Sequence, residues 1–487
     1  MLFNSYIFVL LFLPVALTGW FLLNRCRSQM PANLFLVGMS LWFYGYFNPG
    51  YLWILGGSIV GNYLIARVLC RQELRGGVRK AVLVAGILAN GSCIFCYKYF
   101  DFFITNINSL FGQDFVLLNI VLPLGISFFT FQQISFLVDS YRGETGEYGF
   151  VEYALFVSFF PQLVAGPIVL HREMIPQFRQ EENRHFQGEN LSKGLYIFAR
   201  GLFKKVLIAD TFGLAVSAGY EIVPYLSSME AVLVSVAYTL QLYFDFSGYC
   251  DMAIGIGAMF NIQLPQNFNS PYKAVSILDF WDRWHMSLTR FLREYIYFPL
   301  GGSRGGKAKT YGNIMIVYLV SGIWHGANWT FVLWGALHGV LNCVNRACQK
   351  YWDRLFVAIR WLLTFAAVNL LWIFFRAESV SQAIVFMGRI FGGNGFGVGR
   401  WLTECFDLTE LQFAERAVGI YYKLMESMPG IHAGLFFVLA FVVVLFGKNS
   451  GEVKFRPTLA RALGTIILLV WSIVSFTGVS EFLYFNF

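Results

Sequence analysis

The sequence has few charged residues, and this shortage excludes most kinds of soluble protein. Only 13% of its 487 residues are Asp, Glu, Lys or Arg, whereas about 25% is usual in soluble domains. Hydrophobic residues make up 57% of the chain, and they gather in runs of about twenty, the length that crosses a bilayer. The even spread of these runs predicts one multipass membrane domain over residues 1–487.

Other missing features exclude further classes. The eight cysteines show neither a disulfide framework nor metal-site spacing, and the CxxC of Cys93 and Cys96 lies in an apolar run, where thiols commonly pack between helices. The net charge of +8 does not indicate nucleic-acid binding, because the basic residues fall in short loops between apolar runs. The first run lacks a basic start and a cleavage site, which favours a retained helix over a signal peptide.

Basic residues alternate between the loops that join the first apolar runs. Arg25 and Arg27 follow the first run, the next loop (FNPGY) has no basic residue, and the third (RQELRGGVRK) has four. This pattern places the amino terminus outside and the first and third loops inside. Counting the runs predicts about eleven transmembrane helices, uncertain by about two, in an all-α polytopic protein. The later runs cover about 81–97, 115–138, 151–166, 193–219, 229–260, 312–345, 355–375, 433–447 and 460–478.

Proline and glycine interrupt two of these runs. Pro123 and Gly125 lie in one, and another ends in FFPQLVAGP. Such residues at membrane depth predict broken or re-entrant helices inside a protein-lined core. The polar segment 171–185 is expected in the cytoplasm, and 395–430 is expected to be a less apolar excursion with some amphipathic helix.

One histidine stands in a long apolar stretch, SGIWHGANWT. If a helix begins near Tyr311, His325 lies roughly 21 Å further along the axis, well inside a hydrocarbon core about 30 Å thick. Such an imidazole either bonds a neighbouring helix or acts as a general base, because imidazole titrates near neutral pH. Gly322 and Gly326 leave the backbone open to a close approach by another chain or a substrate.

Other polar groups in apolar surroundings have two interpretations each. His285 lies in DFWDRWHMSLTRFLREY, an amphipathic or re-entrant helix on which Asp282 could share its face. His338 is about 20 Å from His325 along one straight helix, too far to join it unless the helix breaks. Asp245 and Asp251 are intramembrane acids, which either pair with other groups or line a cavity.

The loop GGSRGGKA resembles a phosphate-binding loop but is not one. It ends in Ala308 where a Ser or Thr is required, and no strand pattern precedes it. Arg304, Lys307 and Lys309 could still meet lipid headgroups or the phosphates of a nucleotide-bearing donor.

Several stretches together resemble the membrane-bound O-acyltransferase family, and within it the branch of the alginate O-acetyltransferase membrane subunit. They are the WHG around His325, the upstream FWDRWH and the segment YFDFSGYCDMAIG. Supporting stretches are LPLGISFFTFQQISFLVD, FFPQLVAGPI, LPQNFNSPY and FPLGGSRGG. The resemblance covers nearly the whole chain and is weakest over 395–455.

The resemblance implies a fold and a reaction. The expected fold is a bundle of tilted transmembrane helices, with re-entrant helices, around a central funnel. An acyl thioester, acetyl-CoA in the acetylating members, enters from the cytoplasm, and a polysaccharide hydroxyl is presented from the other side. His325 corresponds to the family's catalytic histidine and His285 to a second catalytic position. The resemblance implies no bound cofactor, no metal and no nucleic acid.

The resemblance also implies a location, a partner and further site residues. The enzyme is expected in the bacterial cytoplasmic membrane, where an extracytoplasmic SGNH or esterase-like acetyltransferase completes transfer to the polymer. Residues expected to bind substrate are Trp324, Asn328, Trp329, Asp245, Arg304 and Lys307.

The carboxyl terminus, SEFLYFNF, resembles the aromatic tail of the teichoic-acid D-alanylation machinery. Tyr484 either relays the acyl group, with His325 as its base, or anchors the chain at the interface. One alternative function is D-alanyl transfer from a carrier-protein thioester. The other is a transporter with His325 as a proton relay, a class that often shows the inverted repeats not seen here.

Overall fold

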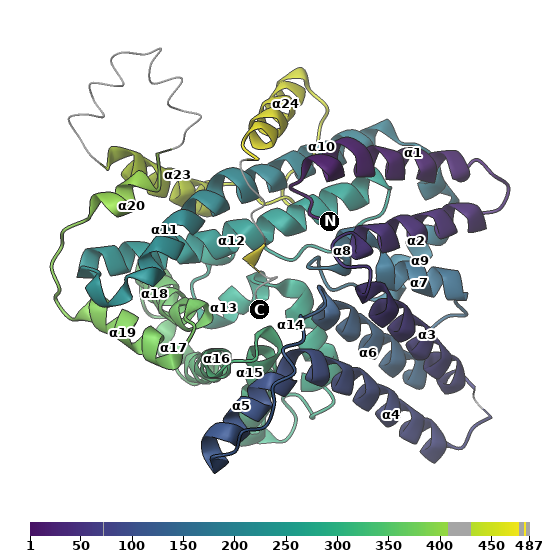
Figure 1. Ribbon diagram of the computed structural model, residues 1–487, viewed down its shortest axis with the longest axis horizontal. Coiled ribbons are helices and arrows are strands. Elements are labelled where there is room, and N and C mark those ends of the chain that lie inside the picture. The colour runs from purple at the N-terminus through teal and green to yellow at the C-terminus, as the bar shows by residue number, and fades with distance from the viewer. Residues whose placement is uncertain (72, 408–429, 477–481, 484–487) are drawn as a thin grey trace.

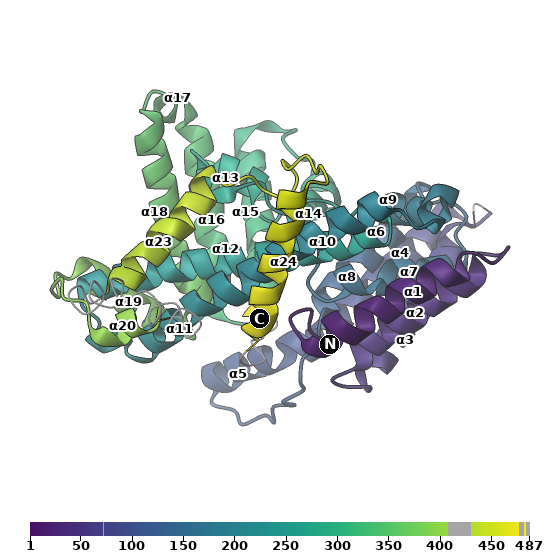
Figure 2. The same cartoon turned by 90° about the horizontal axis from the view of Figure 1, so that it is seen from above.

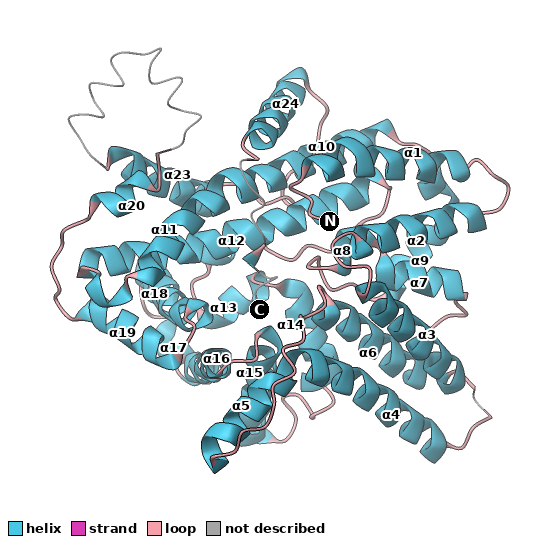
Figure 3. Cartoon of the chain, viewed as in Figure 1, coloured by secondary structure: helices cyan, strands magenta, loops and turns pink. Residues whose placement is uncertain are grey.

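The computed structural model describes residues 1–71, 73–407, 430–476 and 482–483, and these residues form helices and loops without a strand. Figure 3 shows this all-helical composition. The first half contains α1 (Leu13–Leu23), α2 (Met30–Gly45), α3 (Tyr51–Leu69), α4 (Gly76–Ile94), α5 (Phe100–Phe111), α6 (Ile126–Arg142), α7 (Phe150–Ser158), α8 (Phe160–Leu163), α9 (His171–Arg179), α10 (Gly188–Phe203), α11 (Asp210–Glu221) and α12 (Ser228–Met259). The second half contains α13 (Ile277–Arg283), α14 (Met286–Leu292), α15 (Gly306–His325), α16 (Trp329–Ala347), α17 (Gln349–Trp352), α18 (Val357–Arg376), α19 (Val380–Phe391), α20 (Arg400–Glu404), α23 (Ile431–Phe446) and α24 (Leu459–Val474).

Several of these helices are long and apolar, as a polytopic membrane protein requires. In the described part of the chain, three are long and apolar enough to cross a membrane: Tyr51–Leu69, Gly76–Phe111 and Val357–Arg376. Apolar runs take this form because a helix satisfies all its backbone hydrogen bonds internally where no water is present. The predicted all-α fold is confirmed, whereas the expected number of spans stays a prediction.

The 32-residue helix α12 contributes to two hydrophobic cores. In Figures 1 and 2 the helices α1–α4 lie on one side of α12, and α16–α19 lie on the other. Tyr249 and Met252 of α12 belong to the buried apolar cluster of the first half. Tyr243 and Phe246 belong to that of the second half. Both hydrophobic cores therefore meet on this one helix.

Glycines bring α10 and α12 into backbone contact. A Cβ atom on Gly201 would lie 2.6 Å from the Gly248 carbonyl oxygen, and one on Gly248 would lie 2.8 Å from the Gly201 oxygen. Small residues permit such close packing of membrane helices.

Buried ion pairs cross the same interface. Lys204 and Lys205 begin the π-helix Lys204–Ala209, which joins α10 to α11, and they lie 2.7 Å from Asp251 and 2.6 Å from Asp245 of α12. The two intramembrane acids noted in the sequence are thus paired with lysines, one of the two possibilities that the sequence left open.

The predicted breaks at proline and glycine are confirmed. The run near residue 120 is not one helix, because residues 113–123 have no regular secondary structure and α6 begins only after Gly125. Gly125 has φ +73°, and a Cβ there would meet the backbone of Leu163 and Val164 at 2.6–2.9 Å. The run near residue 160 is divided into α7 and α8. Of the excursion 395–430, the structure describes 395–407 and 430, and these residues include one helix, α20.

Candidate active site

His325 is the last residue of α15 and is almost completely buried, with 3% of its surface exposed. Its Nδ1 lies 2.6 Å from the Ser321 carbonyl oxygen, one turn earlier. A carbonyl oxygen only accepts hydrogen bonds, so Nδ1 carries the proton and Nε2 has the lone pair of the neutral ring. This is the tautomer that a general base needs.

A tight turn after His325 reverses the chain into α16. Extended backbone at Gly326 ends α15, and a Cβ on that residue would overlap the ring of Phe331. Gly322 faces Gly335 across the hairpin, where a Cβ on either would meet the other's backbone at 3.0–3.3 Å. The backbone at Gly322 and Gly326 is approached closely, and the approaching group is α16 of the same chain, not another chain or a substrate.

The same reversal brings His338 into the site. The indole of Trp281 donates a hydrogen bond to His338 Nδ1 at 3.3 Å. Trp334 contacts both histidine rings, with centroids 5.0 Å from His325 and 4.9 Å from His338. The break in the helix that would let His338 join His325 is therefore present.

His285 lies beside His325, with ring centroids 6.4 Å apart, and is fully buried. The segment predicted as one amphipathic helix is in fact two short helices, because His285 has φ +45° and ψ +52° between α13 and α14. The expectation that Asp282 could share a helix face with His285 is wrong, because the break removes that face; Asp282 lies 3.4 Å from Arg293. The left-handed backbone conformation of His285 costs free energy, and such conformations are typical of functional sites.

Asn267 holds this unusual conformation and was not singled out by the sequence. Its side-chain oxygen lies 3.1 Å from His285 Nδ1 and accepts hydrogen bonds from Ser287 N at 3.1 Å and Ser287 Oγ at 2.9 Å. Asn267 is completely buried. The only signal for it was its place in LPQNFNSPY, a stretch quoted for the family resemblance.

Aromatic rings enclose the imidazole of His325. The centroid of His325 lies 4.8 Å from Trp324, 5.0 Å from Trp334 and 5.3 Å from Phe375. The other predicted tryptophan, Trp329, is 53% exposed and donates to Asn106 Oδ1 at 2.8 Å. Trp324 is therefore placed at the imidazole, whereas the contacts of Trp329 lie on α5.

Other predicted substrate-binding residues have partners in the protein. The Asn328 oxygen caps α16 by accepting from Thr330 N at 3.0 Å, and its amide donates to Glu378 O at 2.8 Å. Asp245 pairs with Lys205 and accepts Leu483 N at 3.0 Å. Their assignment to substrate binding stays a prediction.

The loop expected to meet the donor lies at the far end of α15. Arg304 and Lys307 are exposed, and Lys307 is eighteen residues before His325 in the chain, roughly 27 Å along a straight helix. The loop and the imidazole are thus separated by about the thickness of a bilayer core. Tyr484 lies outside the described residues.

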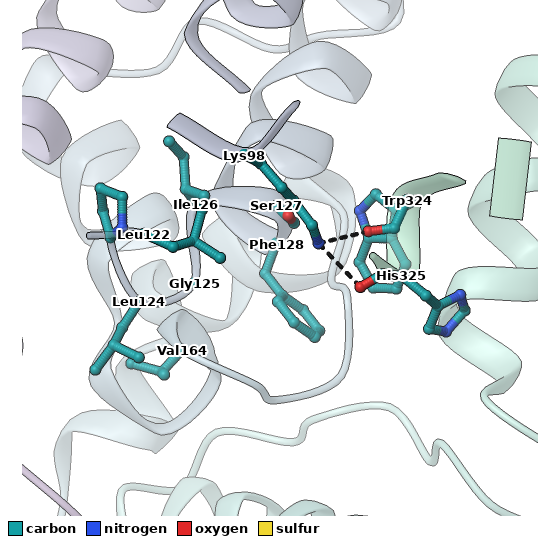
Figure 4. A pocket seen from close by; sticks show the side chains of 11 residues that line it. Lys98, Leu122, Leu124, Gly125, Ile126, Ser127, Phe128, Val164, Trp324 and His325 are labelled. Carbon is teal, nitrogen blue, oxygen red and sulfur yellow. Dashed lines mark hydrogen bonds between the residues drawn. The ribbon is translucent and has the colours of Figure 1, made fainter. Parts of the chain in front are cut away.

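Lys98 is a further polar group at the site that the sequence did not reveal. It lies on a π-helix, Phe95–Tyr99, between α4 and α5. Figure 4 shows its amino group directed at the carbonyls of Trp324 and His325, at 2.8 and 3.0 Å, with the imidazole on the other side of the helix end.

Two cavities meet at Lys98. One of about 30 Å³, room for a water molecule, is also lined by Ser127, Trp324 and His325. The other, of about 360 Å³, is also lined by Asp101 and Asn328. No group of three or more potential metal ligands occurs within the ranges that the structure describes.

Comparison with known proteins agrees with this geometry. Residues 111–380 match the model of the membrane-bound O-acyltransferase family. A peptidoglycan O-acetyltransferase of Helicobacter pylori is 40% identical over 100% of this chain and 98% of its own length. A probable alginate O-acetylase, AlgI, of Pseudomonas aeruginosa is 36% identical over 92% of this chain and 81% of its own.

A teichoic acid D-alanyltransferase of Bacillus subtilis is more distant, with 26% identity over 50% of this chain and 63% of its own length. The family match covers more than half of the chain and includes the histidine hairpin, His285 and Asn267. The chain belongs to the membrane-bound O-acyltransferase family and is an O-acyltransferase.

Proposed function

We propose that this enzyme moves acetyl groups from a cytoplasmic thioester across the bacterial cytoplasmic membrane to hydroxyls of a cell-surface or exported polysaccharide. The observation that carries the proposal is the buried imidazole of His325, fixed in the tautomer of a general base. The full-length relatives that acetylate peptidoglycan or alginate support this class of acceptor. In the proposed architecture, about eleven tilted helices surround a funnel that leads to this histidine.

The reaction transfers the acetyl group from the sulfur of the thioester to the oxygen of a hydroxyl. His325 Nε2 takes the proton of the acceptor hydroxyl while its oxygen attacks the thioester carbonyl carbon. The carbon–sulfur bond breaks, the new oxygen–carbon bond remains, and the departing sulfur receives the proton from the imidazolium. The enclosing rings exclude water, which would otherwise compete as the acceptor. We assign His285 to the site as a second polar group beside the reacting atoms.

The experiment that tests the function measures release of free CoA from acetyl-CoA by the purified protein in liposomes. The extracytoplasmic SGNH-type partner and a polysaccharide acceptor are added, and acetyl ester on the polymer is measured in parallel. Equal amounts of released CoA and of acetyl ester on the polymer would support the proposal. Turnover only with a D-alanyl carrier-protein thioester would support the D-alanyl alternative, and proton flux without any turnover would support a transporter.

We propose acetyl-CoA as the donor, with Arg304 and Lys307 meeting its phosphates as it enters from the cytoplasm. Both are exposed at the end of α15 that the basic loops place in the cytoplasm. Replacing both with glutamine should raise KM for acetyl-CoA about tenfold and leave kcat unchanged, because charge-assisted hydrogen bonds to phosphate contribute about 1.5–3 kcal/mol.

The chain offers a matched control for this prediction. Arg67 and Arg71 are also exposed; Arg71 belongs to the loop predicted to be cytoplasmic, and Arg67 lies one turn earlier in α3. Both line a cavity of about 350 Å³ together with Tyr63, Glu147 and Tyr148. Their replacement with glutamine should leave KM for acetyl-CoA unchanged. A KM effect confined to Arg67 and Arg71 would move the donor phosphates to that cavity.

We propose that Tyr484 receives the acetyl group and passes it to the extracytoplasmic partner. The preceding residues support this idea, because Leu483 N donates to Asp245 and the ring of Phe482 lies 4.5 Å from that of Tyr249. These contacts bring Phe482 and Leu483 to α12, where the ring centroid of Phe246 lies 4.9 Å from that of His285.

Tyr484→Phe should therefore abolish acetylation of the polymer, because the variant lacks the hydroxyl that forms the ester. Tyr225→Phe, at an exposed tyrosine, is the control and should behave as wild type. Acetyl ester on the polymer is measured after alkaline hydrolysis. Normal polymer acetylation by Tyr484→Phe would rule the relay out and leave direct transfer from the thioester.

A further inference from the structure

The end of α15 has an unusual set of hydrogen-bond donors. The last carbonyls of a helix have no donors within the helix, and a buried helix end needs them from elsewhere. Tyr99 OH donates to the Ile323 oxygen at 2.7 Å, and Lys98 Nζ donates to the oxygens of Trp324 and His325 at 2.8 and 3.0 Å. Three consecutive carbonyls that end at the catalytic histidine are therefore held by two adjacent residues of one π-helix.

Supplying these donors from a buried lysine costs free energy. A lysine within an apolar transmembrane segment is unfavourable and usually marks a function. In the part of the chain that the structure describes, its hydrogen-bond partners are these two neutral carbonyls, and no carboxylate forms an ion pair with it. The negative end of the α15 dipole favours a cation at this position. The π-helix supplies the local bulge that directs both Lys98 and Tyr99 to the helix end, and such bulges are frequent at functional sites.

The contact with Lys98 is coupled to the imidazole through the last turn of α15. His325 donates from Nδ1 to Ser321 O, so the ring direction depends on the backbone of that turn. Lys98 binds the same turn from the opposite side, as Figure 4 shows. The residue that follows adds little to this turn, because the Gly326 N–H reaches Gly322 O only at 3.4 Å.

We infer that Lys98 is a positioning residue for His325: its ammonium group fixes the last turn of α15 so that Nε2 faces the reacting hydroxyl. This inference rests on the proposed role of His325 as the base. Lys98 touches neither the imidazole nor the acyl group, and its effect is on the rate of the chemical step.

Lys98→Met should lower kcat about tenfold or more with KM for acetyl-CoA nearly unchanged, because small displacements of a catalytic group are costly in rate. Lys98→Arg, which keeps a cation and several donors, should recover part of this loss. Lys350→Met, at an exposed lysine of α17, is the matched control and should have wild-type kinetics. Elution as a single species in size-exclusion chromatography establishes that each variant is folded.

Chemical rescue separates positioning from folding. Lys98→Ala should be inactive, and added ethylammonium should restore part of its kcat, because the removed side chain opens onto the two cavities that meet there. His325→Ala should gain nothing from ethylammonium. Unchanged kcat in folded Lys98→Met would overturn the inference, and so would a loss that neither arginine nor ethylammonium repairs.

A readout independent of turnover distinguishes this inference from the proposed function. Diethyl pyrocarbonate modifies neutral imidazole, and mass spectrometry follows its rate at His325. That rate should change in Lys98→Met and stay at the wild-type value in Lys350→Met. Inactive wild-type protein would contradict the proposed acetyl transfer alone, whereas an unchanged modification rate in Lys98→Met would contradict the positioning role alone.

Discussion

Replacing His325 with alanine should reduce CoA release by about 10³-fold, because a positioned general base contributes about 10²–10⁴ to the rate. The loss should appear in kcat, since the imidazole acts in the transition state and donor binding is expected elsewhere. CoA release is measured with a thiol reagent on the purified protein in liposomes. His325→Gln should be equally inactive, because an amide cannot take up the hydroxyl proton.

A histidine elsewhere provides the control for this experiment. His185 is exposed, and its recorded hydrogen bond, from Asn261, is made by its backbone oxygen. His185→Ala should therefore keep wild-type kinetics and the wild-type Tm. Retention of more than about a tenth of the wild-type rate by folded His325→Ala would show that another group is the base.

Asn267→Ala should destabilise the protein and remove most of its activity. The substitution leaves the donors of His285 and Ser287 without their common acceptor, at about 1–3 kcal/mol for each buried group. Without this acceptor the left-handed conformation of His285 loses its support, and the ring beside His325 is displaced. We expect a Tm several degrees lower and a fall in kcat of about tenfold to 100-fold.

The control for Asn267 is Asn48→Ala, which removes one hydrogen bond to Gly50 N in an exposed turn. Its Tm and kcat should stay near those of wild type. Asn267→Asp should preserve more of the His285 geometry than alanine does, because it keeps an acceptor oxygen at the same place. It also buries a charge, which costs stability. Equal activity of Asn267→Ala and wild type would remove the second histidine from the mechanism.

The sequence predicted the features that depend on residues close together in the chain. Long apolar runs led to the all-α membrane fold, and Pro123 and Gly125 correctly marked the interruption before α6. His325 was identifiable because an imidazole in an apolar run is costly unless it has a function or a partner. Gly322 and Gly326 indicated a close backbone approach, which the hairpin of α15 and α16 provides.

The remaining site residues depend on contacts between distant parts of the chain. Asn267 reaches His285 across 18 residues, and Lys98 reaches His325 across 227. No spacing rule covers either distance. The error over Asp282 came from assuming a continuous helix, which one left-handed residue interrupts. His338 required knowledge of the turn after His325, which single-helix geometry does not supply.

The ion pairs between α10 and α12 have a consequence for how the protein is made. Each helix alone would bring unpaired charges into lipid, at about 2.5–3.5 kcal/mol for each charged residue at mid-membrane. Lys204 and Lys205 are synthesised some forty residues before Asp245 and Asp251. Lys205 can pair earlier with Asp210, which lies 2.9 Å away, but the charge of Lys204 is neutralised only when α12 arrives, so we expect α10 to wait at the edge of the insertion machinery. The two helices would then enter the bilayer together as one neutral unit.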